Sequence, residues 1–232
     1  MKDSLAEKIA NMTQQDVDWL QENSEAFREL MAYSRCAMME MQTKFNVLNE
    51  ELSLEYDRNP IESIKVRLKK PASILEKLSR KGLQPSVENI EKNIYDIAGI
   101  RVICSFPEDI YMLAMALLRQ DDVRLIERKD YIAHPKENGY RSLHLIVETP
   151  IYLHKEKKKM KVEVQLRTIA MDWWASLEHK IRYKKNLPDM GAINEELKEC
   201  AELSAQLDAR MDTVRQKIEQ AQFAATMAAK EN

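Results

Sequence analysis

The chain has 232 residues, of which 44% are hydrophobic and 32% charged, enough apolar material to bury the core of one domain with extensions or of two small domains. It contains only 4 glycines and 7 prolines, which excludes collagen-like, low-complexity and disulfide-rich loop scaffolds. Its 36 Lys and Arg nearly balance its 38 Asp and Glu. This balance argues against bulk DNA or RNA binding, although a local basic patch remains compatible with it.

The cysteines and the apolar segments indicate the compartment. Cys36, Cys104 and Cys200 are too far apart in the sequence to form a metal-binding motif, so we expect reduced thiols. No apolar run is long enough to span a membrane, and the charged N-terminal residues do not form a secretory signal. We therefore expect a soluble, cytoplasmic protein.

The periodicity divides the chain into three parts. Residues 14–56 contain no glycine or proline and carry scattered Leu, Met and Phe among charges, which is typical of a long helix. Residues from about 190 to 230 are helical again. We expect an N-terminal helical extension over residues 1–59, a compact domain over 60–185 and a C-terminal helical extension over 186–232.

The C-terminal helix carries a seam of residues that alternate by four and three, a heptad pattern. The seam consists of Cys200, Ser204, Leu207, Met211, Val214, Ile218, Ala221 and Ala225. The pattern is compatible with packing on the same domain and with an interface between chains, and the sequence leaves both open.

The middle of the chain holds the strand signals. We predict strands over residues 101–106, 123–132, 142–149 and 161–168, and helices over 71–81, 109–119 and 170–183. The last two strands flank the charged segment 154–159, which we predict to be a hairpin loop, so these strands should be antiparallel. The order of elements predicts an α+β fold with a mixed or antiparallel sheet.

The first basic segment precedes a predicted helix that Pro71 begins and Gly82 ends. Ser73 lies in the first turn of this helix. The cations of the segment are Lys65, Arg67, Lys69, Lys70 and Lys77. Cations that converge on a helix N-terminus make a plausible site for polyphosphate, and a solvated basic face is the alternative.

The second basic segment combines cations with tyrosines. Asn138-Gly139 predicts a tight turn that presents Tyr140 at the start of a strand. In this strand Leu143 should face the core and His144 the opposite side. The other charged or aromatic members are Lys129, Tyr131, His134, Lys136 and Arg141. A tyrosine ring beside cations suits a nucleobase and its phosphates, and an ordinary hairpin with surface cations is the alternative.

The third segment alternates apolar and polar residues. Val162, Val164 and Leu166 should face the core, which leaves a second face with Glu163, Gln165 and Arg167. Asp96, which precedes another strand, is the best candidate to pair with Glu163 around a divalent metal. Hard oxygen ligands of this kind suit Mg²⁺. The spacing in the sequence does not establish that the two carboxylates meet.

Four motifs in this order resemble the RelA/SpoT alarmone synthetase domain. They are R-x-K-x-x-x-S-I-x-x-K from Arg67 to Lys77, D-I-A-G-I-R-V from Asp96 to Val102, K-D-Y-I followed by K-x-N-G-Y-R-S-L-H from Lys129 to His144, and E-V-Q-L-R-T from Glu163 to Thr168. The length of the chain resembles that of single-domain small alarmone synthetases of the RelQ type.

The resemblance implies a nucleotidyltransferase-like fold and an Mg²⁺-dependent transfer of the ATP β,γ-pyrophosphate to the 3′-hydroxyl of GTP or GDP, giving pppGpp or ppGpp and AMP. It implies that the ATP phosphates are bound by Arg67, Lys69, Ser73 and Lys77 and that Arg101 stacks on adenine. Asp96 and Glu163 would hold the metal, with Glu163 also available as the base. The guanine nucleotide would contact Tyr140, Lys129, Lys136 and His144, with Gln165 and Asp172 facing the guanine.

The departures from the family pattern add further expectations. Glu127 stands where bifunctional members carry an arginine, which leaves the preference between GTP and GDP open. The RelQ type often has an aromatic residue and a threonine just before the first ATP motif, associated with alarmone binding at an allosteric cleft. Ser63 and Lys65 occupy that neighbourhood here, which leaves allosteric activation open. The sequence has no His-Asp dipeptide, so we expect no hydrolase activity. The resemblance also implies a homotetramer.

Two alternatives compete with the enzyme. The same basic and aromatic surface would suit a non-catalytic module that binds nucleotides or single-stranded RNA, and the terminal helices alone would suit a scaffold. Asp96 and Glu163 favour the enzyme, because carboxylates repel nucleic acid unless a metal lies between them. Regulation by RNA stays open.

Overall fold

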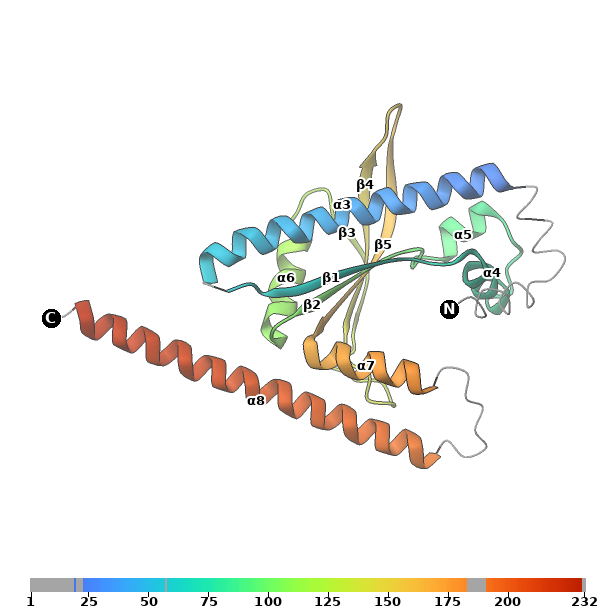
Figure 1. Ribbon diagram of the computed structural model, residues 1–232. Coiled ribbons are helices and arrows are strands. Elements are labelled where there is room, and N and C mark those ends of the chain that lie inside the picture. The colour runs from blue at the N-terminus through green and yellow to red at the C-terminus, as the bar shows by residue number, and fades with distance from the viewer. Residues whose placement is uncertain (1–18, 20–22, 57, 183–190, 231–232) are drawn as a thin grey trace.

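The computed structural model describes residues 19, 23–56, 58–182 and 191–230, which form a mixed sheet flanked by helices (Figure 1). Its helices and strands are, in chain order, α3 (Ser24–Tyr56), β1 (Ile61–Leu68), α4 (Pro71–Arg80), α5 (Val87–Asn93), β2 (Ala98–Cys104), α6 (Pro107–Leu118), β3 (Arg124–Asp130), β4 (Leu143–Tyr152), β5 (Lys157–Thr168), α7 (Ile169–Arg182) and α8 (Gly191–Lys230). This arrangement confirms the predicted α+β fold.

The sheet has the strand order β1-β2-β5-β4-β3. Strands β2 and β5 are parallel, and the other neighbours are antiparallel. The β4–β5 hairpin confirms the predicted antiparallel pair. Because β5 lies between β2 and β4, the sheet joins segments that are far apart in the sequence.

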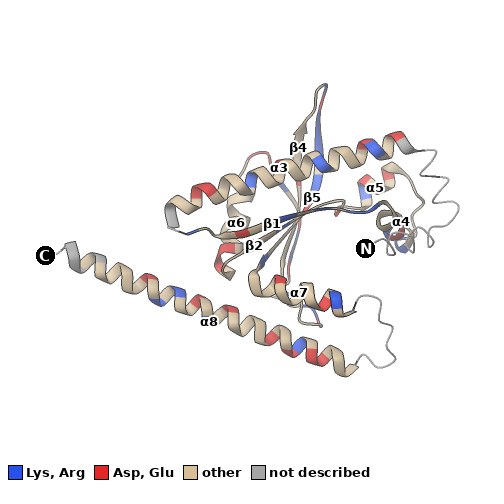
Figure 2. Ribbon diagram, in the orientation of Figure 1, with Lys and Arg blue, Asp and Glu red and all other residues tan. Residues whose placement is uncertain are grey.

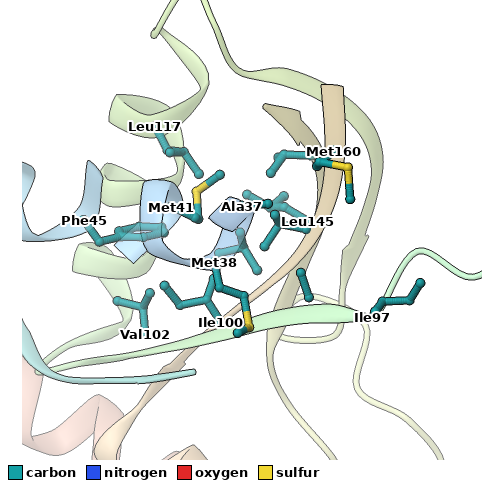
Figure 3. Packing of buried hydrophobic residues seen from close by; sticks show 14 of the residues in the cluster. Ala37, Met38, Met41, Phe45, Ile97, Ile100, Val102, Leu117, Leu145 and Met160 are labelled. Carbon is teal, nitrogen blue, oxygen red and sulfur yellow. The ribbon is translucent and has the colours of Figure 1, made fainter. Parts of the chain in front are cut away.

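The long helix α3 crosses one face of the sheet and supplies much of the core (Figures 1 and 3). Met41 and Phe45 are completely buried. They lie in one hydrophobic cluster with Val102 of β2, Leu117 of α6 and Leu145 of β4. The proposed division of the chain near residue 59 therefore does not coincide with a break in the core, since α3 packs directly on the sheet.

The predicted helices and strands of the middle region are present, with ends that differ by a few residues. The hairpin loop is shorter than predicted, because Lys157 already pairs with Tyr152 and β5 begins there. Lys157 and Lys159 have exposed side chains, so their charge does not oppose strand pairing there. Residue 183 of the predicted helix 170–183, and residues 186–190 of the predicted C-terminal extension, lie outside the described residues.

Two elements were not predicted. Strand β1 is an edge strand in which only Ile61 is buried. Its charged residues interrupt the apolar alternation by which a strand is recognised in a sequence. Helix α5 has 7 residues, too few for a clear helical period. Lys65 and Arg67 therefore lie in a strand rather than in a segment leading directly into a helix.

Helix α8 packs on α7 and on part of α6, along a line of small and polar residues (Figure 1). Ala201, Ser204 and Asp208 are buried there. Most of the predicted seam lies beside this line and is exposed, including Leu207, Met211, Val214 and Ile218. The helix thus packs on its own domain without using the apolar part of the seam. None of the described helices is long and apolar enough to cross a membrane.

Candidate active site

The sheet register places polar side chains from all five strands in rows on the face opposite α3. One row crosses the sheet through Lys65, Arg101, Gln165, His144 and Lys129. A neighbouring row contains Arg67, Gly99 and Glu163 on β1, β2 and β5. Residues that the sequence assigned to two different nucleotides therefore share one face, with Glu163 between them.

A cleft opens over β1, β2 and β5. Its polar lining consists of Lys65, Arg67, Lys69, Asp96, Arg101, Glu163 and Gln165. Gly99 forms part of the floor, and a Cβ atom there would lie 3.3 Å from the Arg67 carbonyl oxygen. The absence of a side chain at Gly99 keeps the space between Arg67 and Glu163 open.

Asp96 lies at the end of the cleft nearest α4. Its Oδ2 atom is 2.9 Å from Nζ of Lys69 and 2.9 Å from Nζ of Lys77. Burial favours a higher pKa for Asp96, but the two ammonium groups outweigh it and lower the pKa. The Oδ1 atom is buried and has no hydrogen-bond partner within the described part of the chain. Asp96 is thus ionised at neutral pH and keeps one oxygen available for a ligand.

Glu163 is partly buried in the middle of the cleft. Gln165 donates a hydrogen bond of 2.9 Å to its Oε2 atom, and His144 Nδ1 lies 3.6 Å from its Oε1 atom. Burial and the charge of Asp96 raise the pKa of Glu163, but His144 and Gln165 outweigh them and the net shift is downward. The carboxylate is therefore in the unprotonated form that a metal ligand and a general base both require.

The two carboxylates fit a magnesium ion that is shared with a nucleotide. Mg²⁺ is commonly bound by one or two carboxylates together with substrate phosphates and water. Asp96 and Glu163 line the same cleft, and the free Oδ1 atom of Asp96 is a hard oxygen donor. Among the described residues no group of three or more His, Cys, Asp and Glu could hold a metal by itself. A metal here would need oxygens from the substrate.

Aromatic rings form the other end of the site. Tyr131, Tyr140 and His144 meet edge to face, with ring centroids 5.3 to 5.9 Å apart. Nζ of Lys136 lies 4.6 Å from the centroid of the Tyr131 ring and 5.0 Å from that of the Tyr140 ring. The Tyr140 hydroxyl is 2.8 Å from His144 Nε2. A cation and flat rings thus gather beside Glu163.

The predicted turn before Tyr140 is present and requires its glycine. Gly139 has φ +84°, and a Cβ atom there would lie 2.5 Å from the Cβ atom of Ala201 in α8. The Asn138 side chain accepts a hydrogen bond from the backbone N–H of Tyr140. Helix α8 therefore supports the loop that carries the aromatic end of the site.

Some predicted site residues lie away from the cleft. Ser73 lies in the first turn of α4, and Lys77 reaches the site through Asp96. Lys129 is on the edge strand β3, where Glu127, at 3.1 Å, raises its pKa. None of these three residues lines the cleft.

The sequence did not indicate the partners that Asp172 has in the structure. Its Oδ2 atom accepts a hydrogen bond of 2.8 Å from Lys65, and its Oδ1 atom one of 3.1 Å from Arg101. Arg167, which the sequence analysis left without a role, is 3.4 Å from Oδ1. Asp172 is thus adjacent to the residue predicted to stack on adenine, and its role towards guanine stays a prediction. The alternation of β5 placed Arg167 on the site face, but only the tertiary structure reveals its burial.

An open sheet face that brings two carboxylates, a cationic cleft and an aromatic platform together is the arrangement expected of an enzyme that transfers a group between nucleotides. Residues 66–187 match the family described as the region found in RelA / SpoT proteins. The chain belongs to the RelA/SpoT family.

Named relatives agree with this assignment. The chain is 45% identical over 191 residues to GTP pyrophosphokinase YwaC of Bacillus subtilis, covering 82% of this chain and 90% of that protein. Small alarmone synthetase 2 of B. subtilis has a crystal structure that matches with a TM-score of 0.75 at 43% identity, over 83% of this chain and all of that one. Small alarmone synthetase 1 of B. subtilis, bound to its product pppGpp, matches with a TM-score of 0.75 at 34% identity, over 84% and 99% of the two chains.

Proposed function

We propose that the protein is a GTP pyrophosphokinase that transfers the β,γ-pyrophosphate of ATP to the 3′-hydroxyl of GTP or GDP, with pppGpp or ppGpp and AMP as products. The observation that carries the proposal is the position of Glu163, which lies between the cationic donor side and the aromatic acceptor side of one sheet face. Membership of the RelA/SpoT family and the names of the relatives support the same reaction.

The donor side binds ATP. Arg67, Lys69 and Lys77, with Ser73 at the start of α4, neutralise its phosphates, because a helix N-terminus and converging cations both favour anions. Arg101 stacks on the adenine. Its buried Nε atom has no hydrogen-bond partner in the described residues and is available to the nucleotide.

The acceptor side binds the guanine nucleotide. Tyr140 stacks on the base, and the nearby side chains of Lys129, Lys136 and His144 contact the phosphates. Gln165, which donates a hydrogen bond to Glu163, faces the guanine. Asp172 reads the base only if guanine replaces one of its present cationic partners.

In the reaction the 3′-oxygen of the acceptor forms a bond to the β-phosphorus of ATP, and the bond from that phosphorus to the oxygen bridging to the α-phosphorus breaks. Glu163 accepts the proton of the 3′-hydroxyl, and AMP leaves with the bridging oxygen. Asp96 and Glu163 would hold Mg²⁺, which would supply neutralisation of phosphate charge. The remaining catalysis consists of positioning and charge neutralisation by the cations of the cleft.

We also propose that the enzyme acts in the cytoplasm, where its nucleotide substrates are available, and that it forms a homotetramer through its terminal helices. The exposed apolar seam of α8 supports an interface between chains. The alternative of a non-catalytic nucleotide- or RNA-binding module has no support among the relatives.

The decisive experiment incubates the protein with labelled ATP, GTP and Mg²⁺ and separates the nucleotides. We expect a guanosine product that carries the label of the ATP β-phosphate, and AMP in equal amount. Glu163→Gln should reduce the rate about 100-fold or more, since it removes a proton acceptor. Glu148→Gln is the matched control, because Glu148 lies on β4 outside the cleft and pairs with Arg124.

Absence of product from the wild type, or an unchanged rate in Glu163→Gln, would overturn the proposal. Incubation of purified ppGpp with the protein should release no pyrophosphate. Release would contradict the expectation that the enzyme lacks hydrolase activity.

A further inference from the structure

Arg167 of β5 is a buried cation that connects the two sides of the site. The residue is 4% exposed. Its Nη2 atom donates hydrogen bonds to the Tyr140 hydroxyl and to Gln165 Oε1, the latter at 3.0 Å. Its Nε atom donates to Ser142 Oγ at 3.3 Å, and its Nη1 atom lies 3.4 Å from Asp172 Oδ1. The guanidinium therefore contacts the acceptor ring through Tyr140 and the donor side through Asp172.

Burial makes these contacts hard to break. Burial, with the nearby charge of Arg101, lowers the pKa of Arg167, although a guanidinium remains protonated in proteins. Loss of a partner would leave a charged group unpaired in a poorly solvated site, which costs much more than the loss of a surface pair. Arg167 therefore holds Tyr140 and Asp172 in a fixed relation to each other.

On the donor side, Asp172 is shared between cations. Its Oδ1 atom accepts a hydrogen bond from Arg101 at 3.1 Å and makes the longer contact with Arg167. Its Oδ2 atom pairs with Lys65. A ligand that attracts the Arg101 guanidinium therefore changes the relative strength of the two interactions that Asp172 makes, one with Arg101 and one with Arg167.

We propose that Arg167 is a positioning residue that couples the two nucleotide sites, so that ATP bound at Arg101 tightens the binding of the guanine nucleotide at Tyr140. By thermodynamic linkage the guanine nucleotide tightens ATP binding by the same factor. The inference rests on the proposed function, because it takes the two sides of the cleft as the donor and acceptor sites.

The direction of the effect follows from the shared carboxylate. When Arg101 stacks on adenine, its interaction with Asp172 weakens. The Asp172 carboxylate then interacts more strongly with Arg167, and the 3.4 Å contact shortens. Arg167 is then held more firmly and so is the Tyr140 hydroxyl. The ring is ordered before the guanine arrives, so the second nucleotide loses less conformational entropy on binding.

The coupling is measured by binding alone. GTP is titrated calorimetrically into the protein with Mg²⁺, with and without saturating AMPCPP, an ATP analogue in which a methylene group replaces the oxygen of the bond that transfer breaks. For the wild type we expect the dissociation constant of GTP to fall fivefold or more when the analogue is present, within the usual range of coupling between sites.

Two variants test Arg167 itself. Arg167→Lys keeps the charge but loses the forked geometry, and it should reduce the coupling to less than about twofold. Tyr140→Phe removes the hydroxyl that Arg167 contacts and keeps the ring for stacking. Whatever the affinity of this variant for GTP alone, the ratio of its dissociation constants without and with the analogue should fall to less than about twofold. Arg124→Lys, in an exposed pair with Glu148, is the matched control and should keep the full coupling.

Each outcome decides the question. A wild type without coupling overturns the inference, and so does full coupling in both Arg167→Lys and Tyr140→Phe. If circular dichroism shows that Arg167→Lys does not fold, Tyr140→Phe decides, since a purely structural role for Arg167 predicts unchanged coupling there. Product formation without coupling overturns this inference alone, whereas failure to bind either nucleotide overturns the proposed function as well.

Discussion

Asp96 combines two roles that oppose each other, since it is an ion-pair partner of two lysines and a candidate metal ligand. Burial raises its pKa, and Lys69 and Lys77 lower it further than burial raises it. Its pKa is thus lower in the folded protein than in the unfolded chain, where an aspartate has a pKa of about 3.9. The ion pairs therefore stabilise the folded protein above that pH, and the stabilisation is lost as the pH falls through the folded pKa.

This linkage predicts the effect of Asp96→Asn. The variant should be less stable than the wild type at pH 6, and the difference should shrink as the pH is lowered below about 3.9, where the carboxylate of the unfolded chain takes up its proton before that of the folded protein. Urea unfolding at a series of pH values measures the difference. Asp121→Asn, at an exposed aspartate, should change stability little at any pH. A difference for Asp96→Asn that is the same at both ends of the range would contradict the pKa shift.

The sequence predicted most of the residues around the cleft but not how they are paired. Motif spacing and strand alternation were sufficient to select Glu163, Arg101 and His144, because a period of two determines which side chains share a face. The contact of Asp172 with Arg101 could not be predicted. It depends on the angle between α7 and the end of β5, which no local sequence pattern determines.

At the scale of elements, the start of α7 and the middle of α8 are joined by a buried carboxyl group. Thr168 donates a hydrogen bond to Asp208, and the Thr168 hydroxyl accepts one from the backbone N–H of Met171. Burial, with the charge of Asp212, raises the pKa of Asp208 despite the hydrogen bond from Thr168. Above the folded pKa, ionised Asp208 therefore destabilises the folded protein. Below the unfolded pKa this destabilisation is absent, because the carboxyl group is protonated in both states.

Asp208→Asn should relieve this cost, because the amide oxygen can still accept the Thr168 hydrogen bond without a charge. We expect a melting temperature a few degrees above wild type at pH 7, as about 1 kcal/mol shifts the melting temperature by roughly 2–4 °C in a chain of this size. The gain should vanish near pH 4. Calorimetry at the two pH values measures it, and a lower melting temperature at pH 7 would contradict the argument.

Elements with a strong apolar period were predictable, and those without it were not. Buried Leu143, Leu145 and Val147 alternate along β4, and the strand was found from them. Strand β1 carries Lys65 and Arg67 on an edge of the sheet, so its membership depends on hydrogen bonds to β2 rather than on its own pattern. The pairing of β1 with β2, which only the tertiary fold determines, makes this segment a strand although its sequence lacks the apolar alternation of one.

At the scale of the whole molecule, charge and exposed apolar surface are distributed unevenly. Figure 2 shows Lys and Arg along β1 and towards the hairpin end of β5, whereas α8 carries both signs. The near-zero net charge is therefore an average over unlike regions. The apolar residues Leu207, Met211, Val214 and Ile218 remain about half exposed on α8, a surface that suits a second copy of the chain.

The proposed tetramer predicts that charge on this surface separates the chains. Wild type should scatter light with four times the chain mass of 27.1 kDa, and Met211→Glu should give a smaller species with its fold intact, since the side chain is exposed. Ala209→Glu, at an exposed position on another face of α8, should keep the wild-type mass. A wild type with the mass of a single chain would refute the tetramer.

The place of β5 between β2 and β4 has a consequence for how activity develops as the chain folds. Gly99 and Glu163 pair across 64 residues of sequence, whereas β3 and β4 pair locally. Contacts between residues that are far apart in the sequence form late, because the entropy of closing the long loop is lost before the contacts stabilise the chain. We therefore expect β1, α4 and β2, which are close in sequence, to assemble before β5 brings Glu163 to them. On this expectation, transfer activity during refolding appears only when β5 has completed the sheet.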